Sequence, residues 1–431
     1  MSITSFRGIS RAVVTGASLF AFASMGNFST AQAADFGGDC CADLEERVAV
    51  LESTTARKGN RKVSLTISGH VNQALLLWDD GDESDVYVVG NANDDLSMFR
   101  FEGDAKIAPG WTTGFTMEIE VASASSGDVS QTDDDAANEI GISEVSMYIE
   151  SERYGKVTWG FAGQPSDGAP EMDLSGAHYA GYAAIADVGG GFQWRMNNGL
   201  GLSGVTLGGV FDDLNGDTFN IIRYDTPTIA GFTLSAAWGE DDLWDVALTY
   251  EKELGAFEVA AAIGYTENRD NDDDGPLNND TLAGSVSILH TPTGLNLTFA
   301  AGERQFNNTP GRADADFYYV KAGIFRRYNS LGKTAIYGEY GQYNDMFYND
   351  GADGADAAAI SNALTGNGAA VINGSEATVW GVGLVQYVDA AAMQLFLAYR
   401  HHELDLDAAG GLAVNGLEDF DTVLAGARIE F

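Results

Sequence analysis

Residues 63–77 of the chain read VSLTISGHVNQALLL, and apolar and polar side chains alternate at the start of this stretch. Successive side chains of a β-strand point to opposite faces. Val63 and Leu65 would therefore lie on one face of an extended strand, with Ser64 and Thr66 on the other. This period of two predicts a strand that is apolar on one side and polar on the other.

The same alternation recurs along the rest of the chain, about sixteen times in all. The further segments that carry it are 99–107, 115–121, 145–149, 157–161, 217–225, 232–238, 244–250, 257–265, 281–290, 294–302, 316–327, 332–343, 376–387, 392–403 and 420–431. Many of them are about ten residues long, the length that crosses a bilayer when a strand is tilted. No segment offers the roughly 18 consecutive apolar residues of a membrane helix.

The connections between these segments alternate in length. Tight turns are expected at 108–110, 151–155, 226–230, 252–255, 291–294, 328–331 and 388–391, and long acidic stretches rich in Gly and Asn at 79–96, 124–138, 164–216, 266–280, 303–315, 344–375 and 404–419. Only the connection near 239–242 breaks the rule. A soluble β-sandwich would also alternate along its strands, but short turns at one end and long loops at the other are typical of an outer-membrane barrel. The fold class is therefore all-β: a transmembrane 16-stranded antiparallel β-barrel.

The charge balance of the 431-residue chain excludes nucleic acid as a partner. Asp and Glu number 63 against 23 Lys and Arg, which gives a formal net charge of -40. Such an excess of acid repels phosphate backbones. Because the apolar face of each strand is nearly free of charge, the acidic residues must lie in loops, turns and the barrel interior.

The first residues are typical of an exported protein. Arg7 and Arg11 precede an apolar stretch, and Ala31-Gln32-Ala33 has the form of a signal-peptidase site, so residues 1–33 are predicted to be a signal peptide. Residues 34–62 would be a periplasmic segment, with a short amphipathic helix over 43–52 that packs either between subunits or against its own barrel. The state of Cys40 and Cys41 is open. Residues 63–431 would be the barrel.

Several motifs are similar to those of a known family. The amino-terminal block of the alphaproteobacterial porin family resembles residues 39–48 (DCCADLEERV) and 54–65 (TTARKGNRKVSL) of this chain. Looser matches, shared by porins broadly, are YGKVTWG at 154–160, RYDTP at 223–227 and the terminal RIEF. The resemblance implies a homotrimer of water-filled, non-enzymatic barrels in the bacterial outer membrane. It also implies contact with membrane lipid and lipopolysaccharide, and passive diffusion of small hydrophilic solutes and ions.

The longest connection, about 164–216, is predicted to fold into the lumen as a constriction loop. It would contribute Asp167, Glu171, Asp173 and Asp187, and the inward positions of the strands place Arg100, Lys106, Arg223, Lys321, Arg400 and Arg428 on the wall, with Glu102, Glu118 and Glu120 nearby. A field between the two sets would orient dipolar solutes. The negative balance predicts cation preference. Alternatively, the wall cations pair with neighbouring acids and serve stability alone.

Metal binding and the rival functions have weaker support in the sequence. Asp270, Asp272 and Asp274 match half of an EF-hand loop, but Thr281 stands where the bidentate Glu belongs, so a solvated loop tip is preferred. No cofactor is expected, although external loops could hold Ca²⁺ or Mg²⁺ shared with lipopolysaccharide. A solute-selective channel and a calcium-dependent adhesin are the alternatives. An outer-membrane enzyme would need His178 or His402 as its base, and no nucleophile motif supports it.

Overall fold

The computed structural model describes residues 62–431 except 94–95, 138–139, 240–241, 270–277, 308, 310 and 352–353. The predicted signal peptide, the amino-terminal helix, Cys40 and Cys41 lie outside the described residues, as do Asp270, Asp272 and Asp274. Among the residues that are described, no helix is long and apolar enough to cross a membrane.

More than half of the described residues lie in β-strands. The strands are β1 (Thr66–Asp79), β2 (Ser84–Gly90), β3 (Ser97–Ala108), β4 (Trp111–Val121), β5 (Ile140–Ser151), β6 (Gly155–Gly163), β7 (Gln193–Met196), β8 (Gly201–Thr206), β9 (Thr218–Asp225), β10 (Phe232–Gly239), β11 (Trp244–Leu254), β12 (Phe257–Asn268), β13 (Asn279–His290), β14 (Leu295–Phe306), β15 (Ala315–Arg327), β16 (Lys333–Asn344), β17 (Ile372–Val388), β18 (Met393–Ala408) and β19 (Phe420–Glu430). One α-helix, α3 (Gly354–Thr365), lies between β16 and β17.

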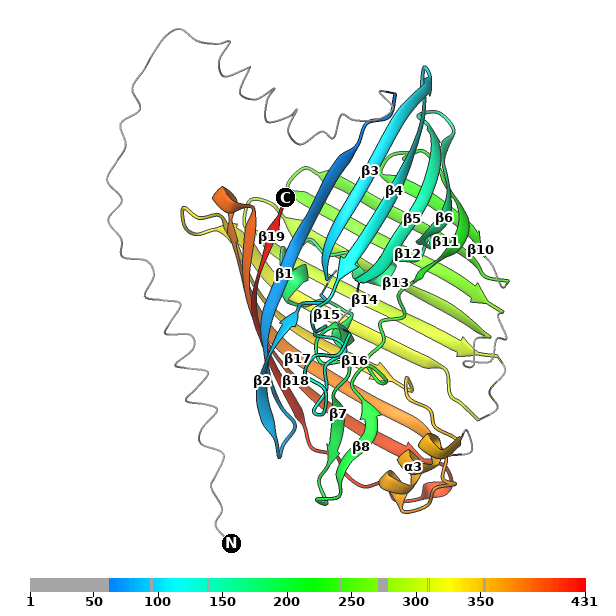
Figure 1. Cartoon of the computed structure of the whole chain (residues 1–431), viewed down its shortest axis with the longest axis vertical. Coiled ribbons are helices and arrows are strands. Elements are labelled where there is room, and N and C mark those ends of the chain that lie inside the picture. The colour runs from blue at the N-terminus through cyan, green and yellow to red at the C-terminus, as the bar shows by residue number, and fades with distance from the viewer. Residues whose placement is uncertain are drawn as a thin grey trace. The chain divides into compact units, whose positions relative to one another are not determined.

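The sheet closes on itself as an antiparallel barrel (Figure 1). β1 pairs along its length with β19, so that His70 lies opposite Glu430. On its other edge β1 pairs first with β3 and then with β2. Because β2 and β3 share one position in the wall, the barrel has 16 strand positions, as the alternation predicts.

One part of the predicted strand pattern is wrong. Residues 79–96 are expected to form a loop, yet β2 occupies Ser84–Gly90 and pairs with the end of β1. Its inward side chains, Tyr87 and Val89, are buried and apolar, while its outward side chains, Val86 and Val88, are exposed and apolar. A strand that is apolar on both faces has no period of two to detect.

The connections follow the predicted order, with tight turns at one end of the barrel and longer segments at the other. The β5–β6 turn shows why a turn of this kind needs glycine: Gly155 has φ 87°, and a Cβ there would lie 2.1 Å from the carbonyl oxygen of Asp225. The connections from β1 to β2 and from β10 to β11 are the short ones at the long-loop end.

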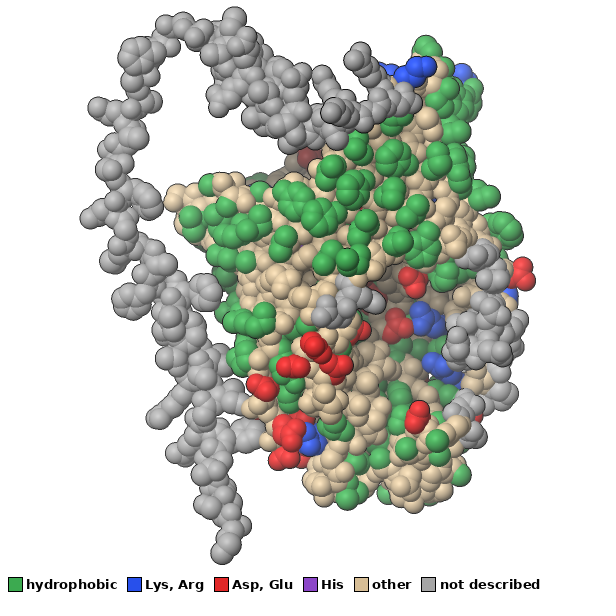
Figure 2. Space-filling model, in the orientation of Figure 1, with side chains coloured by type: hydrophobic (Ala, Val, Ile, Leu, Met, Phe, Trp, Pro, Cys, Tyr) green, Lys and Arg blue, Asp and Glu red, His purple; other side chains and the backbone are tan. Residues whose placement is uncertain are grey.

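The two faces of the wall differ in polarity. Outward side chains such as Leu248 and Ile263 are exposed and apolar, whereas inward ones such as Ser287 and Thr298 are buried and polar. Figure 2 shows apolar side chains spread over the outward surface of β3, β4 and β5, with acidic side chains towards the end that carries the long connections. An exposed apolar belt of this extent is what a lipid-facing wall requires.

Candidate functional site

The long connection between β6 and β9 lies against inward-facing side chains of the wall. The backbone N–H of Met172 donates to Ser285 Oγ and that of Leu174 to Ser287 Oγ, both at 2.9 Å. Farther along, Tyr343 donates its hydroxyl to the carbonyl oxygen of Ala183 at 2.6 Å. These wall residues alternate with exposed apolar ones, so the first half of the connection runs inside the barrel, across β13 to β16.

Lys321 and Arg400, predicted to line the pore, hold this connection in place instead of facing water. The Lys321 ammonium lies 2.6 Å from Asp173 Oδ2 and 2.7 Å from the carbonyl oxygen of Gly181. Arg400 pairs with Glu339 at 2.8 Å and donates to the carbonyl oxygen of Tyr182 at 3.0 Å. The two cations are only 1% and 2% exposed. A buried charge needs a partner of opposite sign, and the connection and wall supply it.

The other predicted cations differ in their exposure. Arg428 is buried, pairs with Glu430 and lies 4.0 Å from the ring centroid of Tyr179. Arg223 is half-buried and donates to the carbonyl oxygen of Gly163 at 3.0 Å, while pairing with Asp225 at 2.9 Å. The alternative hypothesis, that the wall cations pair with neighbouring groups and serve stability, thus fits Arg428 as well as Lys321 and Arg400.

Arg100 and Lys106 keep more contact with water. Arg100 is half-exposed and pairs with the buried Glu118 on β4. Lys106 is exposed and borders a cavity at the β3–β4 turn. Among the predicted wall cations, Arg100, Lys106 and Arg223 are therefore the ones with access to the lumen.

A cavity of about 530 Å³ lies between the connection, β4 and the segment that follows β4. Its described lining includes six carboxyl groups: Glu120, Asp128, Asp167, Glu171, Asp187 and Asp213. No Lys or Arg is found among the described residues that line it. Glu120, Asp167, Glu171 and Asp187, which the sequence predicts at the constriction, are among these residues, whereas the predicted Asp173 pairs with Lys321 elsewhere. Asp128 and Asp213 were not predicted, because their only signal in the sequence is that they are acids in connections.

The pKa values of two of these carboxyl groups, Glu171 and Asp213, are raised. Burial, with the neighbouring negative charge of Asp212 and Asp187, raises the pKa of Asp213 to about 7. Burial and the charges of Asp213 and Asp187 raise the pKa of Glu171 well above its ordinary value. The negative charge of the cavity therefore depends on pH near neutrality.

A second cavity, of about 930 Å³, lies nearer the tight turns. Its lining combines acids with two cations: Glu144, Glu150, Glu152, Asp167, Asp225 and Glu251, with Lys156 and Arg223. Asp167 borders both cavities. The water-accessible space therefore follows the side of the barrel made by β4 to β6 and β9 to β11.

Only the β7–β8 hairpin of the β6–β9 connection departs from the lumen path predicted for 164–216, because Asp213 and Asn215 beyond it line the acidic cavity and Phe211 packs against Tyr343. This hairpin lies at the long-loop end, near α3 (Figure 1). Arg195 on β7 pairs with Asp80 at 2.8 Å, and Asn197 donates its backbone N–H to the carbonyl oxygen of Gly416 at 2.9 Å. The hairpin thus joins the β1–β2 turn to the β18–β19 connection.

An apolar cluster fills the inner side of the wall at β1, β18 and β19. Phe192 packs against Trp78 and Phe420, with ring centroids 5.0 and 5.2 Å apart. His402, the histidine considered as a catalytic base, is fully buried there and its Nδ1 contacts the carbonyl oxygen of Phe420 at 2.9 Å. Its burial prevents it from reaching a dissolved substrate. His178 stacks on Tyr182, 4.2 Å between centroids.

The known proteins to which this chain is similar are porins and outer membrane channels. The family model described as Gram-negative porin matches residues 17–407. An anion-selective porin from Comamonas acidovorans has 15% sequence identity, covers 86% of this chain and 100% of its own, and superimposes with a TM-score of 0.55. The outer membrane channel DcaP of Acinetobacter baumannii has 12% identity, with 87% and 99% covered and a TM-score of 0.50. A comparison with curated proteins finds no match. At these identities the two structures share the fold.

Proposed function

Because the chain belongs to the Gram-negative porin family and closes into a barrel of the outer membrane, we propose that it is a water-filled pore for small hydrophilic solutes and ions. Diffusion through it is passive and prefers cations. The observation that carries this proposal is the 530 Å³ cavity with six carboxyl groups and no Lys or Arg among its described lining residues. A narrow cleft of one charge sign concentrates ions of the opposite sign.

The burial of the wall cations supports this preference. The charge of Lys321 is offset by Asp173 and that of Arg400 by Glu339. A buried pair has little net charge to present to a passing ion. Of the three cations with access to the lumen, Arg100 and Arg223 also pair with an acid, and Lys106 lies at the β3–β4 turn, away from the acidic cavity. The transverse field expected from the sequence is correspondingly weaker than the net negative field of the carboxyl groups.

We assign the constriction to residues 164–188, the part of the β6–β9 connection that contacts inward-facing side chains. Its anchors are the Asp173–Lys321 pair, the hydrogen bonds that its backbone N–H groups donate to Ser285 and Ser287, and the one that its backbone accepts from Tyr343. A segment attached at several places along the wall narrows the lumen without blocking it, since the 930 Å³ cavity continues beside it.

Reversal potentials in a planar bilayer test the selectivity. With KCl at different concentrations on the two sides, a cation-preferring pore gives a potential of the sign set by K⁺, whereas anion preference would contradict the proposal. Liposome swelling in uncharged sugars of increasing size tests general diffusion. Rates that fall smoothly with size support it, and saturable uptake of one sugar would favour the alternative, a solute-selective channel.

The same proposal includes a homotrimer in contact with lipopolysaccharide. The outward apolar side chains Val88 of β2 and Ile140, at the long-loop end of β5, are 70% and 74% exposed, which favours coverage by another subunit. Heat-dissociable trimers on a gel support this, and monomers after mild extraction would contradict it. The exposed acids Asp133, Asp134 and Asp135 form a cluster suited to a divalent cation shared with lipid phosphates. Loss of bound lipopolysaccharide on chelation tests that contact.

A further inference from the structure

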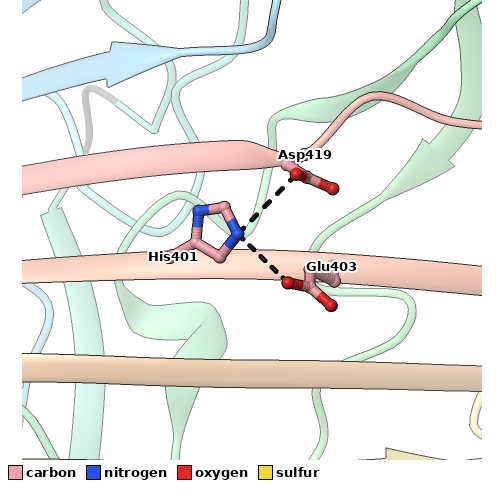
Figure 3. Close-up of side chains that lie close together, drawn as sticks. All are labelled: His401, Glu403 and Asp419. Carbon is pink, nitrogen blue, oxygen red and sulfur yellow. Dashed lines mark hydrogen bonds and ion pairs between the residues drawn. The ribbon is translucent and has the colours of Figure 1, made fainter.

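One histidine on the outward face of the barrel lies among three carboxylates. His401 is on β18, and the cross-strand register places it opposite Asp421 of β19 and Trp380 of β17. Glu403 follows it on the same face of β18, and Asp419 directly precedes β19. Figure 3 shows the imidazole of His401 with one ring nitrogen turned towards both Glu403 and Asp419.

The cluster marks the point where the apolar outer surface ends. On β18 the outward side chains change from Leu397, through Tyr399, to His401 and Glu403. Tyr399 and Trp380 pack edge to face, with ring centroids 5.5 Å apart. Aromatic side chains of this kind lie at membrane interfaces. The polar cluster therefore begins on the water side of the lipid belt, at the end with the long connections.

Asp421 fixes the orientation of the His401 ring. Its Oδ1 lies 2.8 Å from His401 Nδ1 and also accepts the hydroxyl of Tyr399 at 2.7 Å. A carboxylate at Nδ1 keeps the ring proton there. The lone pair of Nε2 in the neutral ring then faces Glu403 and Asp419. A carboxylate that holds the far nitrogen of a metal-binding histidine is the usual second contact of such sites.

The spacing around Nε2 fits a metal ion. Glu403 Oε1 is 3.3 Å and Asp419 Oδ2 is 3.7 Å from Nε2, and the three donor atoms all lie within 4.8 Å of one another. Neighbouring ligand atoms of a tetrahedral zinc site are about 3.4 Å apart, given metal bonds of about 2.0 to 2.2 Å. A lone pair and two carboxylates that converge on one point repel each other unless a proton on Nε2 or a metal cation lies between them.

We propose that His401, Glu403 and Asp419 bind a divalent transition-metal ion of the zinc class, with Asp421 as the residue that positions His401. The imidazole distinguishes this site from the all-oxygen sites that Ca²⁺ and Mg²⁺ prefer. The two ligand carboxylates are 58% and 62% exposed, so ions in the external medium can reach the site. Three protein ligands leave a fourth position for water.

Calorimetric titration of the full chain in detergent with Zn²⁺ tests the proposal. The thiols of Cys40 and Cys41 are first alkylated, because thiolates also bind zinc. The expected result is one saturable site that Ca²⁺ in excess does not displace, and visible absorption bands when Co²⁺ replaces Zn²⁺. Absence of a saturable site, or displacement by equimolar Ca²⁺, would overturn the proposal.

Variants identify the ligands. His401→Ala is expected to remove the site, and Asp421→Asn to weaken binding 10- to 100-fold. Asp405→Asn removes the same charge from the same face of β18, and His290→Ala removes another histidine; both are expected to bind Zn²⁺ as the parent does. Equal binding by His401→Ala and the parent, or equal losses in Asp405→Asn and Asp421→Asn, would refute the assignment.

A measurement on the unsubstituted protein keeps the test independent of whether the variants fold. Diethyl pyrocarbonate modifies accessible imidazole nitrogens, and peptide mass spectrometry reports the rate at His401. Zn²⁺ is expected to slow this reaction at His401 and leave it unchanged at His290. Equal rates at His401 with and without Zn²⁺ would contradict metal binding at Nε2, and would indicate that the imidazole is neutralised by a proton instead.

Discussion

Neutralising Asp128 and Asp167 together should reduce the cation preference of the pore sharply. Both side chains are exposed and both border the 530 Å³ acidic cavity. Asp128→Asn and Asp167→Asn keep the size of each side chain and remove one negative charge each. The side-chain amide of Asn215 donates to Asp167 at 3.3 Å, and an amide oxygen can still accept that bond, so the local structure should persist.

The size of the effect follows from the dimensions of the cavity. A sphere of about 530 Å³ has a radius of about 5 Å, so an ion at its centre interacts with each carboxylate by about 0.8 kcal/mol in bulk water. Screening at 0.1 M salt lowers this to about 0.5 kcal/mol. Since cations and anions respond with opposite sign, removing two carboxylates changes the ratio of their permeabilities by about 2 kcal/mol, roughly 30-fold. At 1 M salt the screened effect falls to about threefold.

Reversal potentials of the parent and the double variant, measured at both salt concentrations, check these values. Asp405→Asn is the matched control, because it removes a charge from the outward face of β18 and not from the lumen. A double variant that keeps the parent's permeability ratio at 0.1 M salt would refute the reasoning, and so would a control that shifts the ratio as much.

Three further predictions concern the pH response, the anchoring of the constriction and the lipid-facing wall. Burial raises the pKa of Asp213 to about 7, so this carboxyl gains negative charge between pH 6 and pH 8. Reversal potentials should show that the cation preference of the parent rises over this interval and that of Asp213→Asn does not. The stability that the raised pKa contributes at low pH is lost as the pH rises through 7. Lys321→Met leaves Asp173 buried without its partner and should lower the free energy of unfolding by about 3 to 5 kcal/mol. The double variant Lys321→Met/Asp173→Leu should recover most of this loss. Denaturant titration in detergent measures both variants, and a single variant as stable as the parent would contradict the role of the pair. Leu248→Arg places a charge on the lipid-facing side of β11 and should shift the free energy of folding into bilayers by about 2 to 4 kcal/mol in favour of the unfolded chain. Thr249→Arg, on the lumen side, should destabilise the barrel far less. Equal destabilisation by the two variants would contradict the assignment of the two faces.

The alternation of side chains was sufficient to predict the barrel, because lipid requires an apolar outer face and water in the lumen permits a polar inner one. Segments such as 257–265 and 281–290 correspond to β12 and β13 within a few residues. β2 was missed where the interior is not wet: Tyr87 packs 6.0 Å, centroid to centroid, from Phe192 of the β6–β9 connection. Because the β6–β9 connection buries the inward side chains of β2, these side chains are apolar and do not alternate in polarity with the outward ones.

The candidate site was predictable only in part. Inward parity is a property of the strand, and Lys321 and Arg400 lie on strands whose inward side chains are buried against the β6–β9 connection. Whether an inward side chain meets water depends on the path of the β6–β9 connection, which no local pattern specifies. Asp128 and Asp213 illustrate the same limit, because an acid in a connection has no periodicity to show which way it points.

Single-channel recording after reconstitution of the purified protein into a planar bilayer tests the central claim most directly. The pore account predicts stepwise, ohmic increases in current as folded barrels insert, in groups of three for a trimer, with a reversal potential that follows the K⁺ gradient. Folded barrels that insert into the bilayer, as shown by protease protection of the strands, and yet conduct no current would contradict it.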